Sequence, residues 1–118
     1  MSYDIRLTHP VTGETLHVEN IHHMRGGTYT KGGTRECWLN VTYNYSPFFY
    51  SLFGSEGIRA IYGKTGAESI PVLKAVMDRL GDDVDDDYWA ATEGNAKAAL
   101  ASLLALAQMR PDGVWKGD

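Results

Sequence analysis

Residues 22–53, HHMRGGTYTKGGTRECWLNVTYNYSPFFYSLF, decide the fold of this chain. The stretch begins basic and rich in glycine, continues with alternating apolar and polar residues, and ends aromatic. The alternation over residues 38–44 predicts a half-buried strand. The aromatic part begins with Ser46 and Pro47, a pair that is typical of a helix N-terminus. The stretch therefore predicts a loop, a strand and a helix, in that order.

Two more strands are predicted before this stretch. Residues 3–8 alternate between apolar and polar, and residues 15–19 do the same. The segment PVTGE, residues 10–14, supplies turn residues between them. The two strands are therefore predicted to pair as an antiparallel hairpin.

Helices are predicted for most of the chain after residue 45. Residues 46–53 are apolar nearly all round, so this helix should be largely buried. Apolar residues spaced for one helix face predict a later helix that starts near Ser69, because Pro71 is tolerated only in a first turn. The same spacing predicts a last helix that starts between Thr92 and Asn95.

Strands followed by helices predict an α+β fold in a single domain over residues 1–118. We expect a small antiparallel sheet of about three strands from the N-terminal half, covered on one face by C-terminal helices. The net charge of -4 argues against general duplex-DNA binding. No apolar run is long enough for a membrane span, and the single Cys37 suggests no oxidising compartment.

The sequence contains no catalytic or metal motif of high specificity. Gly63-Lys64-Thr65 imitates the end of a phosphate-binding loop but lacks the required first glycine and the preceding strand. The acidic run Asp82–Asp87 lacks the glycine and the glutamate of a calcium loop, so it favours a solvated loop, with a basic partner as the alternative. His22 and His23 lack ligands paired at short spacing. We therefore assign no catalytic residue, no metal ligand and no cofactor.

Candidate binding residues lie in the loop 22–35 and on the uncovered face of the predicted sheet. Glycine pairs permit positive φ and close approach of the backbone, and successive backbone N–H groups in turns can form nests for anions. Arginine can grip a phosphate with two hydrogen bonds, and an aromatic ring can stack on a base. The alternative is a flexible connection beside a solvated face. The candidate residues are His22, His23, Arg25, Tyr29, Lys31, Arg35, Trp38, Asn40 and Asn44.

A resemblance is carried by five strings that are spread over residues 22–115: HHMRGGTY, LNVTYNYS, YGKTGAESIPVL, DDVDDDYWAATEGNAK and RPDGVW. The chain resembles small uncharacterised proteins carried by bacteriophages and prophages. This resemblance implies a cytoplasmic protein made inside a bacterial host, and it assigns no catalytic residue. The resemblance therefore also implies binding to a host or defence component, as small proteins of that origin often do.

Three functional hypotheses follow. The first is a non-enzymatic interaction protein, for example an inhibitor of a bacterial host or defence protein, with contacts from the loop 22–35, the open sheet face and Asp82–Asp87. The second is a protein that binds or sequesters a small anionic ligand such as a nucleotide through the glycine-rich loop. The third is an enzyme with His22 or His23 as general base, although no nucleophile accompanies them. A homo-oligomer is compatible with each.

Overall fold

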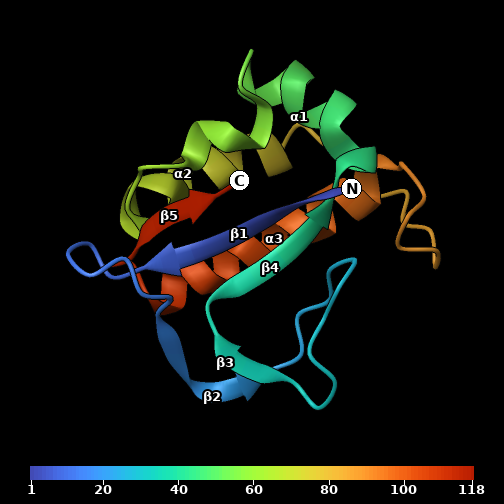
Figure 1. Cartoon of the computed structure of the whole chain (residues 1–118). Helices are drawn as coiled ribbons and strands as arrows, with labels where there is room; N and C mark the ends of the chain where they lie inside the picture. Colours follow the sequence, from blue (N-terminus) through green and yellow to red (C-terminus); the bar gives the residue numbers. More distant parts are fainter.

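The computed structural model describes residues 1–118. The strand β1 (Ser2–Thr8) is the central strand of the main sheet, and its alternating apolar side chains are buried on one face. β1 pairs antiparallel with β4 (Trp38–Thr42) on one side and with β5 (Val114–Gly117) on the other. The order of strands is β4-β1-β5 (Figure 1). The main sheet therefore joins segments from both halves of the sequence.

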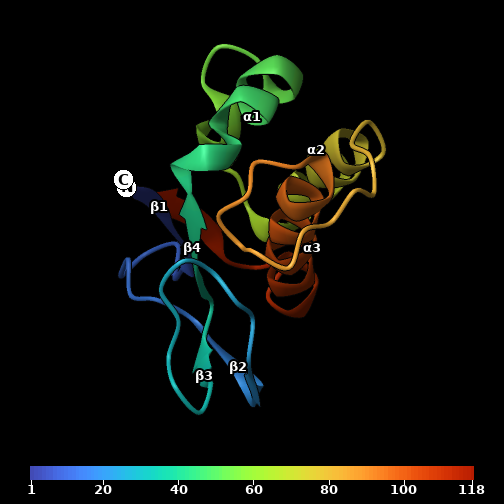
Figure 2. The same cartoon turned by 90° about the vertical axis from the view of Figure 1, so that its right-hand side faces the viewer.

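A second, two-stranded sheet pairs β2 (His17–His22) with β3 (Thr34–Glu36) and extends away from the main sheet as an arm (Figures 1 and 2). The predicted hairpin between residues 3–8 and 15–19 is therefore wrong. Only an isolated bridge between Thr8 and Thr15 links the two segments. The reason is that β4 and β5 occupy both edges of β1, so β2 pairs with a short strand at the end of the predicted loop.

Helices pack on one face of the main sheet and at one end of it. Figure 2 shows α2 (Gly66–Met77) and α3 (Glu93–Met109) on one side of the sheet, with α1 (Ser46–Phe53) above them. Two short 3-10 helices, η1 (Tyr43–Tyr45) and η2 (Gly57–Ile61), flank α1. The predicted α+β class, with a small antiparallel sheet and helices in the C-terminal half, is confirmed.

One hydrophobic core connects the sheet with these helices. Ile5 and Leu7 of β1 are fully buried, as are Leu100 and Leu103 of α3. Trp115 of β5 is also fully buried, and its indole N–H donates a hydrogen bond of 2.7 Å to a serine hydroxyl of α2. None of the helices combines the length and the apolar composition that crossing a membrane would need.

Two helices differ in detail from their predictions. α1 has the predicted bounds, but Phe49 is its only fully buried residue, because one side of the helix faces solvent. α2 begins at Gly66, three residues before the predicted Ser69. The cause is a capping box, in which the side chains of Thr65 and Glu68 each accept a hydrogen bond from the other residue's backbone N–H.

Candidate binding site

The first glycine pair lets the loop 22–35 lie directly on β4. The Gly27 N–H donates to the Asn40 carbonyl oxygen at 3.2 Å, and the Thr28 N–H donates to the Asn40 side-chain oxygen at 3.1 Å. A Cβ atom on Gly26 would overlap the main chain of Asn40, and one on Gly27 would collide with the Trp89 ring. Close approach of the backbone is therefore a requirement of this packing.

The second glycine pair makes a tight turn with backbone groups left free. The Gly33 N–H donates to the Thr30 carbonyl oxygen at 3.0 Å, and Gly32 and Gly33 have φ angles of 85° and 86°. These angles favour glycine over other residues. The N–H groups of Lys31 and Gly32 make no hydrogen bond within the protein, so they are available to a ligand.

The folded loop encloses a cavity of about 230 Å³ beside Trp38. The cavity wall contains basic and aromatic side chains and no acidic one. The lining includes six of the predicted residues: His22, His23, Arg25, Tyr29, Lys31 and Trp38. Residues that are near one another in sequence therefore converge on one space.

The cations of this cavity have no carboxylate partner. The structure contains two ion pairs, one between α3 and the acidic segment 82–87 and the other in the turn after α3, so neither involves the loop. The Arg25 guanidinium carbon lies 5.7 Å from the centroid of the Tyr29 ring, within cation–π range. The positive charge at Arg25 and Lys31 is therefore available to an anion.

His22 lines the cavity, but its ring makes hydrogen bonds to the protein backbone. Its Nε2–H donates to the Glu36 carbonyl oxygen at 2.6 Å, and its Nδ1 accepts from the Met24 N–H at 3.3 Å. Both ring nitrogens are therefore occupied, which leaves His22 no free nitrogen for a ligand or for general base catalysis. His23 makes no hydrogen bond through its ring.

The remaining three candidate residues lie outside the cavity. The Arg35 Nε–H donates to the Val18 carbonyl oxygen at 3.1 Å, which directs this side chain toward β2. The prediction that Asn40 and Asn44 lie on an open sheet face is wrong. Asn40 is buried because the loop covers it, and Asn44 lies beyond the strand in η1, where its amide donates to the Trp89 carbonyl oxygen at 2.8 Å.

Tyr88 is a residue whose role the sequence does not reveal. Its hydroxyl donates to the Asn40 carbonyl oxygen at 3.1 Å and accepts from the Thr42 N–H at 3.0 Å. Burial raises the pKa of this phenol, so the hydroxyl keeps its proton. The neighbouring Trp89 packs against Gly27. The only signal in the sequence is the aromatic pair after the acidic run.

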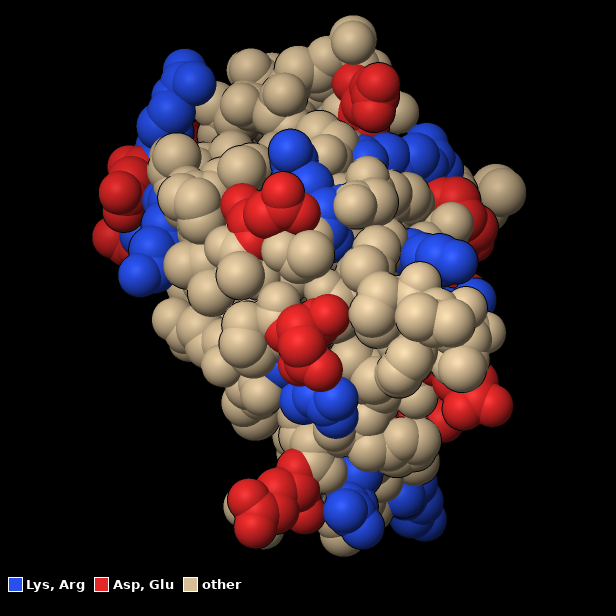
Figure 3. All heavy atoms as spheres, turned by 90° about the vertical axis from the view of Figure 1, so that its left-hand side faces the viewer, with Lys and Arg blue, Asp and Glu red and all other residues tan.

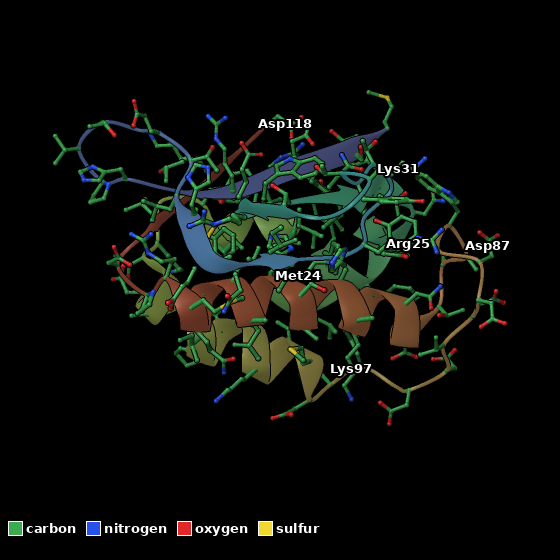
Figure 4. All side chains as sticks on the ribbon, turned by 90° about the horizontal axis from the view of Figure 1, so that it is seen from below. Met24, Arg25, Lys31, Asp87, Lys97 and Asp118 are labelled. Carbon is green, nitrogen blue, oxygen red and sulfur yellow. The ribbon has the colours of Figure 1, made fainter.

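A second cavity, of about 270 Å³, shares Arg25 with the first. It lies between α3 and the acidic segment, and its lining includes Asp85 and Asp86. Figure 4 shows Arg25 on the side of the loop next to the segment that carries Asp87. Lys31 lines only the first cavity. A substitution of Lys31 therefore tests ligand binding there more specifically than a substitution of Arg25 does.

Other sequence features have structural roles. Cys37 is fully buried, and this burial raises the pKa of its thiol to about 11. Thr65 of the Gly63-Lys64-Thr65 segment caps α2. No group of three or more His, Cys, Asp or Glu side chains is placed to hold a metal ion. On the side that Figure 3 shows, basic and acidic side chains are interspersed, so no large patch of one sign marks a further site there.

The cavity offers unpaired cations, free backbone N–H groups and aromatic rings, which together suit an anion that carries a ring. No protein-family model, curated protein or solved structure matches the chain.

Proposed function

We propose that the protein is a non-enzymatic binding protein that holds a small anionic ligand of the nucleotide type in the cavity of the loop 22–35. The observation that carries this proposal is a cavity of about 230 Å³ whose charged lining is entirely basic and unpaired. Lys31 and the free N–H groups of its turn suit a phosphate, and Trp38 and Tyr29 offer ring faces to a base.

Binding is tested with a panel of nucleoside monophosphates and inorganic phosphate. A ligand at a hundred times its dissociation constant should stabilise the fold by about 2.7 kcal/mol, which a thermal shift detects. Lys31→Ala should weaken binding at least about tenfold, because it removes a charge-assisted hydrogen bond. Titration calorimetry measures the loss.

Arg35→Ala is the matched control, since it removes one charge from the same loop while its side chain points to β2. It should keep the affinity of the unmutated protein. A panel without any thermal shift would contradict the proposal, and so would an equal loss of affinity in both variants.

A second candidate function is that of a phage-type inhibitor that binds a bacterial host or defence protein inside the cell. The observation that favours it is a groove of about 540 Å³ that runs along the whole of β2 and reaches the end of α3. Ile21 and Met109 line this groove and are 58% and 45% exposed. Exposed apolar side chains beside a protruding arm suit a protein contact.

Ile21→Asp should abolish capture of such a partner from bacterial lysate, because it places a charge in the apolar part of the groove. Val11→Asp is the control, since Val11 is 86% exposed and lies outside the groove. Quantitative mass spectrometry compares the captured proteins. A partner that the Ile21→Asp protein retains at full stoichiometry would rule out this surface.

A further inference from the structure

The face of the main sheet opposite the helices carries a row of one aromatic and two basic side chains. Arg6 of β1 lies directly opposite Trp38 of β4 and opposite Lys116 of β5. Side chains that are directly opposite in antiparallel strands point to the same side of the sheet. Arg6 and Lys116 are exposed, and neither takes part in an ion pair.

Trp38 connects this row to the cavity, because its side chain belongs to both. Neighbouring strands are about 4.8 Å apart, so the row from Trp38 to Lys116 spans about 10 Å. A continuous path therefore leads from Lys31 in the cavity, past the indole ring, to two further cations on the sheet.

Acidic side chains bound the row on one side and are held by hydrogen bonds. The Asp4 carboxylate accepts from the Trp38 indole N–H at 3.3 Å, and the Asp118 carboxylate accepts from the Asp4 N–H at 2.9 Å. A polyanion on this face would consequently be repelled from the Asp4 end and directed along the basic row.

We propose that the ligand of the cavity is one nucleotide of a short single-stranded nucleic acid, whose backbone continues across Arg6 and Lys116. This inference rests on the proposed nucleotide site. Stacking on aromatic rings combined with a basic track is how single strands are bound without sequence readout. Such a site needs an unpaired base, which a duplex does not offer.

The charge distribution of the protein is compatible with this ligand despite a net charge of -4. One third of the acidic residues lie in the segment 82–87. Figure 2 shows that the loop between α2 and α3 lies on the helix side of the sheet. Arg6 and Lys116, on the opposite face, are therefore separated from the most acidic part of the surface, which approaches the cavity only at Arg25.

Fluorescence anisotropy tests the inference on the full chain. The probe is a labelled oligothymidylate of about eight nucleotides, a length within the range that one OB-fold covers. Thymidine monophosphate, measured by calorimetry, reports on the cavity alone. The double variant Arg6→Ala/Lys116→Ala should weaken oligonucleotide binding by about tenfold, and reduce its salt slope by about 1.4 for two lost phosphate contacts. Its affinity for the mononucleotide should not change.

Lys74→Ala/Arg79→Ala is the matched control, because it removes the same charge from exposed positions on and after α2. It should leave both affinities unchanged. Mononucleotide binding that persists while the oligonucleotide gains no affinity, or loses none in the Arg6/Lys116 variant, overturns the single-strand inference and leaves the nucleotide site intact. Absence of mononucleotide binding overturns the nucleotide site, and the inference fails with it.

Discussion

Phe49→Asp is expected to abolish folding. Phe49 is fully buried, and its ring lies 6.3 Å from that of Tyr45, 6.5 Å from that of Tyr3 and 5.9 Å from that of Phe53. Removing a buried phenylalanine costs about 3–5 kcal/mol, and an unpaired carboxylate among these rings adds a desolvation penalty of several kcal/mol. Together these costs reach the total stability of about 5–15 kcal/mol that a domain of this kind has.

Circular dichroism and the disappearance of a cooperative thermal transition measure this loss. Tyr50→Asp is the control in the same helix, since the Tyr50 side chain is 45% exposed and its replacement should leave the fold intact. A Phe49→Asp protein that melts cooperatively near the temperature of the unmutated chain would show that α1 does not pack on the core with this face.

Gly26→Ala is expected to release the loop from β4 and to eliminate ligand binding while the core remains folded. The added methyl group would overlap the main chain of Asn40, and a strand backbone cannot rotate away as a side chain does. The loop must therefore move, which breaks the hydrogen bonds that Gly27 and Thr28 make to Asn40. Lys31 and Tyr29 reach the cavity from this loop. When the loop moves, both side chains therefore leave their positions in the cavity wall.

Hydrogen exchange at the Thr28 amide and mononucleotide titration measure the two effects. Exchange at Thr28 should become fast while the β1 amides stay protected. Gly81→Ala serves as the control substitution, because a Cβ there makes ordinary contacts only. Unchanged protection of Thr28 together with full affinity would disprove the role assigned to the glycine pair.

Local signals made α1 predictable. Pro47 and Gly54 mark its ends within the sequence itself. The helix has the predicted bounds, although Tyr45 and not Ser46 is its N-cap and no side chain caps it. The pairing of β2 was not predictable in the same way, because it depends on β5, which comes from the other end of the chain to occupy one edge of β1. Its partner β3 has three residues, which is too short for a periodic pattern to emerge.

The same distinction applies to the candidate site. Basic residues and glycines next to each other in sequence predicted the loop, and the structure brings six of the nine candidate side chains to its cavity. The open-face prediction for Asn40 is wrong because strand periodicity reports the side of the sheet and not what covers that side. The loop itself buries Asn40, so only the folded chain reveals the change.

The Tyr88 hydroxyl has a consequence for association between copies of the protein. An edge strand with unpaired N–H and C=O groups is a template on which another chain can add a strand and start an aggregate. On β4 this edge is occupied by a phenol that satisfies both the Asn40 carbonyl oxygen and the Thr42 N–H. Together with the Gly27 N–H, which donates to the same carbonyl oxygen, this side chain keeps that part of the β4 edge from accepting a strand of another copy.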